Sequence, residues 1–359
     1  MNIVDIDKDL KKFSKNGLFK KFDFPNEKFL LLGGYYDKDF GFIKVPQKEV
    51  KHKKSVFAWG TKCTAGVRVL FSTNSKNVLL TGTMFSKCEM EKMTYLGSVS
   101  FTLCEIVKGK EVFVCDLYPS IGTNQIDFIA QSKLKGNKVR DYILYFPLSC
   151  AVSKLSIGFD KKSIVQPYEK YLKTKPILYY GSSNTQGICA NRANSCYQSL
   201  VAEWSNIDYY ILEEVENAED EEKMERFLSN FNCSVFVYDY GYGALSIDYL
   251  AKRHLSLYKK FRSIEKNKNT PIIFVTRPSR GRNSKDALRY EIIKATYEYA
   301  QIKGDKNVYF IDGKKLYPKD IKEHCLVDGY YLTDLGFYFF AKKVYKIIEK
   351  IVAKEEIGV

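Results

Sequence analysis

The sequence "PILYYG", residues 176–181, is a short apolar run that ends in glycine, and it sets the pattern of the second half of the chain. Similar runs follow, namely "DYYILEE" (208–214), "CSVFVYDY" (233–240), "PIIFVTRP" (271–278) and "VYFIDG" (308–313). Continuous apolar runs of this length are typical of strands that are buried on both faces. Longer amphipathic segments separate them, and this alternation predicts a doubly wound parallel sheet of the α/β class.

The amphipathic segments predict the helices that cover this sheet. They are "SCYQSLVAEW" (195–204), "AEDEEKMERFLSN" (218–230), residues 247–266, "ALRYEIIKATYEYAQIK" (287–303) and "LGFYFFAKKVYKIIEKIV" (335–352). Ligands of such sheets bind beyond the carboxyl ends of the strands, so we expect the functional site in the loops that follow the apolar runs.

The first half of the chain has a different period. In "GVRVLFSTNSKNVLLTG" (66–82), apolar residues alternate and a polar "NSKN" turn follows, which indicates a hairpin. The same pattern recurs in residues 99–117, 141–148 and 154–160, and no long helix intervenes. We therefore predict an antiparallel, jelly-roll-like β-sandwich over residues 1–170 and an α/β/α domain over residues 171–359.

Composition narrows the class of protein. The net charge is +15, but the excess lysines are spread along the chain, so we do not expect a nucleic-acid partner. The nine cysteines are scattered, without the spacing of a metal site or a disulfide framework, so no metal or cofactor is expected. Neither a signal peptide nor an apolar run long enough for a membrane helix is evident, and we expect a cytoplasmic protein. The residues do not indicate an oligomeric state.

The stretch "YYGSSNTQG" (179–187) places two serines on a strand-to-helix turn. A serine in this position can face a reaction site while the backbone N–H groups at the helix start stabilise an oxyanion. It can equally be a helix cap, because serine is a preferred N-cap residue. The turn alone does not distinguish the two roles.

Four blocks of the sequence, taken together, resemble the SGNH or GDSL hydrolases. They are "YGSSNTQGICANRANS" (180–195), "DYGYGAL" (239–245), "GDKNVYFIDG" (304–313) and "CLVDGYYLTDLGFYFFA" (325–341). Their order and spacing resemble the branch that carries a β-sandwich before the catalytic domain. This resemblance implies a flavodoxin-like fold for the doubly wound sheet of the second half. "CDLY" (115–118) is similar to a signature of that sandwich but stands out of register, and we interpret it as a coincidence.

The resemblance implies roles for particular residues. Ser183 takes the position of the nucleophile, and Asp328 that of the acid that orients a catalytic histidine three residues later. Tyr331 stands at the histidine position and Gly243 at the position of an oxyanion-stabilising asparagine. The family normally has a glycine-containing block between the serine block and the block that contains Gly243. That block has no counterpart in this chain.

These departures weaken the expected chemistry. A serine becomes a nucleophile when a base near neutral pKa removes its proton, and tyrosine, with a pKa of about 10, does this poorly. Of the three histidines, His254 lies on a predicted helix, where we expect a solvated or capping role, and His52 precedes the sandwich. His324, four residues before Asp328, is a possible alternative base.

Basic and aromatic side chains supply candidate substrate contacts. Arg192 matches an arginine of the family's first block, Arg280 belongs to "RPSRGR" (277–282), and Tyr330 offers a flat amphipathic surface. Two interpretations stay open. One is an esterase-like protein with weak or absent hydrolysis of a carbohydrate or small-molecule ester. The other is a non-catalytic pseudoenzyme that binds a glycan or an acyl ligand.

Overall fold

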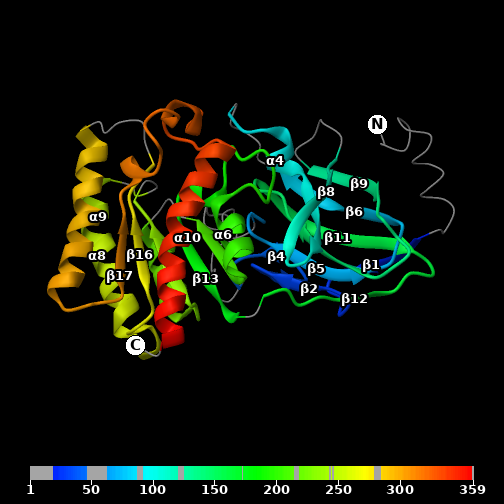
Figure 1. The fold of residues 1–359 in the computed structure, drawn as a ribbon, viewed down its shortest axis with the longest axis horizontal. Coiled ribbons are helices and arrows are strands. Elements are labelled where there is room, and N and C mark those ends of the chain that lie inside the picture. Colours follow the sequence, from blue (N-terminus) through cyan, green and yellow to red (C-terminus); the bar gives the residue numbers. More distant parts are fainter. Residues whose placement is uncertain are drawn as a thin grey trace. The chain divides into compact units, whose positions relative to one another are not determined.

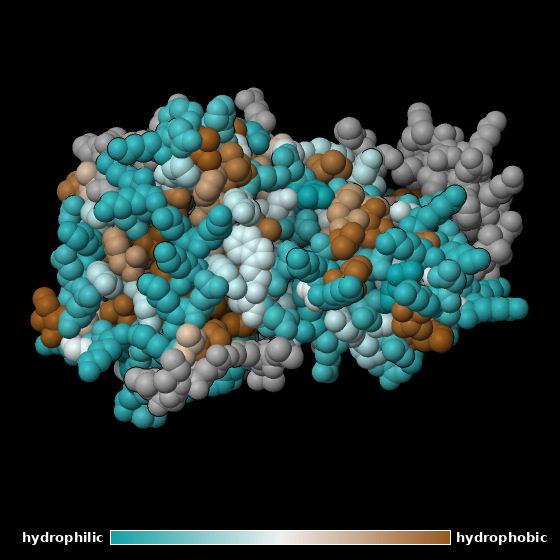
Figure 2. Space-filling view, viewed as in Figure 1, coloured by the Kyte–Doolittle hydropathy of each residue, from teal (hydrophilic) through white to brown (hydrophobic). Residues whose placement is uncertain are grey.

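The computed structural model describes residues 19–46, 63–86, 92–119, 125–171, 173–213, 218–241, 244, 246–278 and 284–357. Within these ranges the chain forms two compact units (Figure 1). Residues 19–44 and 63–170 belong to the first unit, and residues 171–357 belong to the second, together with Val45, which lies in its core. Hydrophilic residues cover most of the visible surface, with small apolar areas between them (Figure 2).

The first unit is built from antiparallel strands, as predicted. One sheet has the order β1-β11-β6-β9. The other has the order β12-β5-β10-β7-β8, with β2 paired to β5. The strands are β1 (Phe19–Asp23), β2 (Leu30–Leu32), β5 (Arg68–Thr73), β6 (Asn77–Ser86), β7 (Phe101–Val107), β8 (Lys110–Leu117), β9 (Gln125–Lys133), β10 (Arg140–Tyr145), β11 (Cys150–Asp160) and β12 (Val165–Pro167). A small hairpin of β3 (Tyr35–Asp37) and β4 (Gly41–Ile43) and a short helix α4 (Tyr95–Val99) complete the unit.

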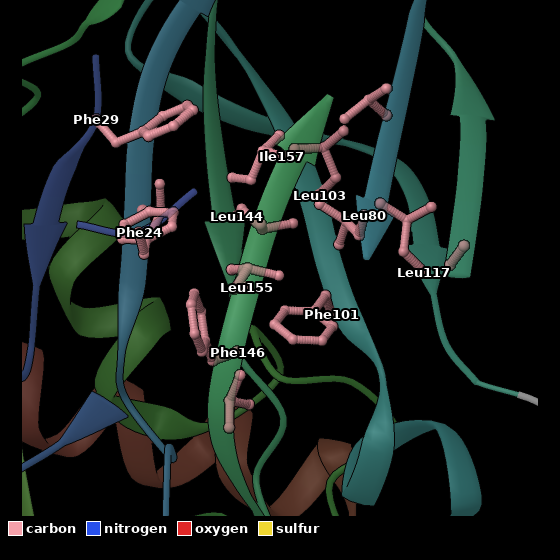
Figure 3. Packing of buried hydrophobic residues seen from close by; sticks show 14 of the residues in the cluster. Phe24, Phe29, Leu80, Phe101, Leu103, Leu117, Leu144, Phe146, Leu155 and Ile157 are labelled. Carbon is pink, nitrogen blue, oxygen red and sulfur yellow. The ribbon is translucent and has the colours of Figure 1, made fainter. Parts of the chain in front are cut away.

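Alternation along the strands explains the core of this unit. Every second side chain of a strand points to the same face, so Leu80, Leu103, Leu144 and Ile157 converge between the sheets (Figure 3). The hairpin pattern predicted for residues 99–117 is confirmed by the antiparallel pairing of β7 with β8. The hairpin predicted at the "NSKN" turn is wrong, because this turn connects β5 to β6, and these two strands belong to different sheets.

The second unit contains the predicted parallel sheet, in the order β14-β13-β15-β16-β17. Its strands are β13 (Lys173–Gly181), β14 (Ile207–Glu213), β15 (Val235–Asp239), β16 (Ile272–Val275) and β17 (Val308–Ile311). The first strand in sequence, β13, pairs with both β14 and β15, which is the flavodoxin-like order. Loops on either side of β13 therefore diverge, and this is where ligands of such sheets bind.

Helices cover both faces of the parallel sheet (Figure 1). They are α5 (Ser183–Gln186), α6 (Tyr197–Ser205), α7 (Ala218–Asn230), α8 (Ile247–Ser263), α9 (Ser284–Ile302) and α10 (Asp334–Ile357). Leu178, Tyr180 and Tyr238 share a cluster with residues of α7, α8 and α9. On the other face, Tyr179 contacts Tyr197 of α6, which stacks on Phe340 of α10 at 4.0 Å between ring centroids. None of the described helices is long and apolar enough to span a membrane.

Candidate active site

The serine turn follows β13, at the carboxyl end of the first strand of the parallel sheet. Ser183 begins α5, and Gly187 ends it in the left-handed conformation, with φ of 95°. Gly181 is required by close packing, because a Cβ there would lie 2.3 Å from the Thr185 hydroxyl and 2.7 Å from the Asp239 carbonyl oxygen. The short helix is thus held between two glycines, which places Ser183 at the edge of the sheet.

A buried hydrogen bond joins this turn to the end of β15. The Thr185 hydroxyl donates to Oδ2 of Asp239 at 2.7 Å, and Asp239 is only 6% exposed. Burial raises the pKa of the nearby Tyr197 well above its ordinary value, and the charge of Asp239 raises it further. Tyr197 therefore keeps its proton and stays neutral beside the Asp239 carboxylate.

The loop between β17 and α10 contains Asp328 and Tyr331. Oδ1 of Asp328 accepts hydrogen bonds from the backbone N–H groups of Tyr330 and Tyr331, both at 3.0 Å. Val327 N–H donates to the Tyr331 carbonyl at 2.8 Å, and Leu326 bridges to Leu332. Asp328 therefore organises the turn that presents both tyrosines, as aspartate commonly does.

Two hydrogen-bonded links bring this loop to the serine turn. Asn184 Nδ2 donates to the Tyr330 carbonyl at 3.1 Å. Asn191 donates to Asp334 twice, from its backbone N–H at 2.9 Å and from Nδ2 at 3.0 Å. The structure thus brings the segments of Ser183, Asp328, Tyr330 and Tyr331 together. The Ser183 hydroxyl is half-buried and makes no hydrogen bond with another described residue.

The surroundings of His254 and His324 show which roles these histidines can have. His254 is fully buried on α8, with its ring 4.4 Å from the Tyr238 ring and Nδ1 2.8 Å from the Thr296 hydroxyl, so the expected solvated or capping role is wrong. Burial lowers its pKa to about 3. His324 is exposed, and its imidazole has no hydrogen bond to any described residue. His52 lies outside the described residues.

The candidate substrate contacts are only partly described. Arg192 is half-buried in the segment between α5 and α6. Tyr330 is 37% exposed, and the guanidinium carbon of Arg277 lies 4.0 Å from the centroid of its ring, a cation–π contact. Arg280 and Gly243 lie outside the described residues. The catalytic and binding roles of all these residues stay predictions.

Three residues of this region did not stand out in the sequence. Asn184 and Asn191 connect the serine turn to the last loop, and Arg277 stacks on Tyr330. Both asparagines belong to the first block of the resemblance and Arg277 to "RPSRGR", so proximity to a motif was their only signal. Among the described residues, no group of three or more His, Cys, Asp or Glu side chains could hold a metal ion.

A parallel sheet with a serine turn after β13, its first strand in sequence, in a chain that also carries an antiparallel sandwich, defines an esterase-like α/β protein. Residues 174–349 match the GDSL-like Lipase/Acylhydrolase family, and residues 23–165 match GxDLY, the N-terminus of SGNH-type esterases. The chain therefore belongs to the SGNH/GDSL hydrolase family, in the branch with an N-terminal β-domain. The second match includes "CDLY", which the sequence alone had suggested to be a coincidence.

Solved structures show the same fold at low sequence identity. A GDSL-like lipase from Bacteroides ovatus is 22% identical with a TM-score of 0.79, over 93% of this chain and 98% of that one. The salicylyl-acyltransferase SsfX3 from a tetracycline biosynthetic pathway is 12% identical with a TM-score of 0.73, over 94% and 98%. A family two carbohydrate esterase from Clostridium thermocellum, in complex with cellohexaose, is 13% identical with a TM-score of 0.56, over 82% and 94%. No curated protein matches the chain.

Proposed function

We propose that the second unit binds an acylated carbohydrate or another small ester at the Ser183 turn, and hydrolyses it far more slowly than a complete Ser-His-Asp site. The observation that carries the proposal is the occupant of the position three residues after Asp328, which is Tyr331. The exposed imidazole of His324, without a hydrogen bond to Ser183 in the described part of the chain, supports it.

The expected loss of rate follows from the chemistry of the base. A tyrosine with an ordinary pKa of about 10 is deprotonated in about one molecule in a thousand at pH 7. Loss of the base of a serine triad lowers turnover by about 10⁶, the value known for subtilisin. Loss of an oxyanion donor, as implied by Gly243, costs a further factor of about 10² to 10³ if the two effects are independent.

The ligand class rests on the surroundings of Tyr330. Its ring is partly exposed and carries the Arg277 guanidinium, so the loop offers a flat amphipathic surface beside a positive charge. Carbohydrates suit such surfaces, and the structural neighbour that holds cellohexaose supports this ligand class. Binding without turnover, the pseudoenzyme interpretation, is the limiting case of the same proposal.

Turnover of an acetyl ester, such as p-nitrophenyl acetate, tests the proposal. We expect the native protein and Ser183→Ala to differ little from the uncatalysed rate. Tyr331→His should restore measurable hydrolysis, because Asp328 is retained three residues upstream to orient an imidazole. Adding Gly243→Asn should raise the rate by about a further 10².

Tyr338→His provides a matched control, since Tyr338 lies on α10 and is 40% exposed. This variant should leave the rate unchanged. Robust native turnover that disappears in Ser183→Ala would overturn the proposal, because the protein would then possess another base. Cellohexaose binding to the native protein tests the ligand class separately.

We also propose a cytoplasmic location. Eight described cysteines are thiols outside any disulfide, and seven of these are buried, with Cys115 partly exposed. Cysteines that form no disulfides are typical of proteins in a reducing compartment. Thiol titration of the protein purified from cells without reductant should detect free thiols, and intramolecular disulfides in that preparation would contradict the proposed location.

A further inference from the structure

A second candidate site lies in the first unit, where the β5–β6 turn meets the β11–β12 turn. An open hollow of about 540 Å³ is lined there by Phe19, Asn74, Ser75, Lys76, Asn77, Asp160, Lys161, Lys162 and Ser163. Its volume is within the range of small-molecule sites, about 300 to 1,000 Å³. We refer to these residues as the sandwich hollow.

Hydrogen bonds to Asp160 hold the two turns of the hollow in place. Its Oδ2 accepts from the Ser75 hydroxyl at 3.0 Å and from Lys76 N–H at 2.8 Å, and its Oδ1 accepts from Asn77 Nδ2 at 2.9 Å. Burial by itself would raise the pKa of Asp160, but these hydrogen bonds outweigh it and lower the pKa. Asp160 is therefore a charged structural anchor, and the hollow is formed before any ligand arrives.

The charge of the hollow is positive. Lys76, Lys161 and Lys162 are exposed, and none forms an ion pair with a described residue. Asp160 is the single carboxylate of the lining, and both of its oxygens already accept hydrogen bonds. The hollow thus has three ammonium groups and one carboxylate whose oxygens are already hydrogen-bonded. This balance of charge favours a negatively charged ligand.

The remaining polar atoms of the hollow suit hydroxyl groups. Asn74 Oδ1 accepts from Ile164 N–H at 2.8 Å, which leaves its Nδ2 as a donor. Asn77 donates through Nδ2, which leaves its Oδ1 as an acceptor. Neither remaining atom is bonded to a described residue. A sugar hydroxyl both donates and accepts, and the half-buried Phe19 ring provides an apolar surface for the C–H face of a sugar.

From these contacts we infer that the sandwich hollow binds an anionic sugar, a pyranose that carries a carboxylate or a phosphate group. The lysines supply the charge, the two amides the hydroxyl contacts and Phe19 the apolar surface. This site is composed of residues of the first unit alone, so the inference does not depend on Ser183 or on the proposed esterase-like function.

Calorimetric titration of the whole chain with four probes tests the inference. The probes are glucose 6-phosphate, glucuronate, glucose and inorganic phosphate, which separate the contributions of charge and sugar. We expect at least one of the two charged sugars to bind at least tenfold more tightly than both glucose and inorganic phosphate. The binding should weaken as salt is added, because exposed charges are screened.

Lysine variants locate the binding. Lys161→Gln combined with Lys162→Gln should weaken binding of the charged sugar by about tenfold or more, since hydrogen bonds to charged groups are among the stronger ones. Lys154→Gln is the matched control. Lys154 is exposed on β11, the strand that ends at Asp160, and lies six residues, or about 20 Å, from Asp160. It should bind like the native protein, as should Ser183→Ala.

Several outcomes would overturn the inference. Equal binding of glucose and the charged sugars would exclude the role of the lysines, and equal binding of inorganic phosphate would exclude the sugar contacts. Failure of all four probes to bind would exclude the site. Unchanged binding in the double lysine variant, with an unchanged melting temperature, would place the ligand elsewhere.

Discussion

The cores of the two units differ in the aromatic residue that fills them. In the sandwich the buried cluster is rich in phenylalanine, with Phe24, Phe29, Phe42, Phe71, Phe101, Phe128, Phe146 and Phe159 and only one fully buried tyrosine, Tyr142. In the α/β unit the cluster against α7, α8 and α9 contains Tyr180, Tyr210, Tyr238, Tyr240 and Tyr258. The buried sandwich cluster contains one tyrosine hydroxyl, whereas the cluster of the α/β unit contains several.

The difference shows how each unit is stabilised. Phenylalanine contributes burial and ring packing without a polar atom to satisfy. A buried tyrosine hydroxyl costs free energy unless it finds a hydrogen-bond partner. The hydroxyl of Tyr179 has no partner among the described residues, and Tyr179 lies on β13, which leads into the serine turn. The α/β unit thus buries an unsatisfied hydroxyl beside its candidate site, whereas the phenylalanines of the sandwich cluster carry no hydroxyl.

The largest expected effect concerns the phenylalanine core. Phe101 is fully buried and lies beside Phe146 (Figure 3), with 5.0 Å between the ring centroids. Its ring centroid is 5.5 Å from that of Phe128. We expect Phe101→Ala to lower the free energy of unfolding of the sandwich by about 3 to 5 kcal/mol, because it removes the burial and leaves a cavity. Hydrogen exchange of peptides from β7 and β10 would measure the change in this unit alone.

Phe85→Ala is the control for this variant, since Phe85 is 41% exposed. It should cost less than about 1 kcal/mol. If both variants lowered the free energy of unfolding equally, the burial of Phe101 and its packing against the neighbouring rings would not stabilise the sandwich.

An intermediate effect is expected from pH in the α/β unit, whose core contains the buried His254. The pKa of His254 is lowered from 6.5 to about 3 by burial, so the folded state keeps it neutral while the unfolded state binds a proton. The unfolded state binds more protons between about pH 6.5 and pH 3, so stability falls as pH falls through this window, by up to about 1.4 kcal/mol per unit.

Urea unfolding at pH 7, 6 and 5 measures this slope. His254→Gln should reduce the slope by up to the contribution of one proton, because the buried imidazole is then absent. An unchanged slope in His254→Gln would mean that the buried imidazole is not responsible for the acid sensitivity of the α/β unit.

The smallest effect tests the cost of the buried hydroxyls. The Tyr179 hydroxyl is buried without a partner, so Tyr179→Phe should stabilise the α/β unit by about 1 kcal/mol. Tyr238→Phe is the matched comparison, because its hydroxyl donates to the His254 carbonyl at 3.2 Å, and this variant should destabilise by about 1 kcal/mol. The same sign of effect in both variants, measured by urea unfolding, would refute the distinction between paired and unpaired tyrosines.

Local sequence patterns predicted the secondary structure of the α/β unit closely. The apolar runs became the strands of the parallel sheet, which are four to nine residues long, and the amphipathic segment 218–230 became α7 with the same bounds. These features depend on residues that are close in sequence, and the periods of buried strands and helices differ. The alternating runs of the first half predicted an antiparallel sandwich for the same reason.

Contacts distant in sequence were decided only by the tertiary structure. Nothing near Phe19 indicates that β1 pairs with β11, whose Asp160 lies opposite it, or that Asp160 anchors the sandwich hollow. The links from Asn184 and Asn191 to the last loop join segments more than 140 residues apart. Likewise, the helical period of α8 places His254 on one face of the helix but does not say which groups pack there. Burial, and with it the low pKa of His254, is a property of neighbours brought together by folding, and no local pattern contains it.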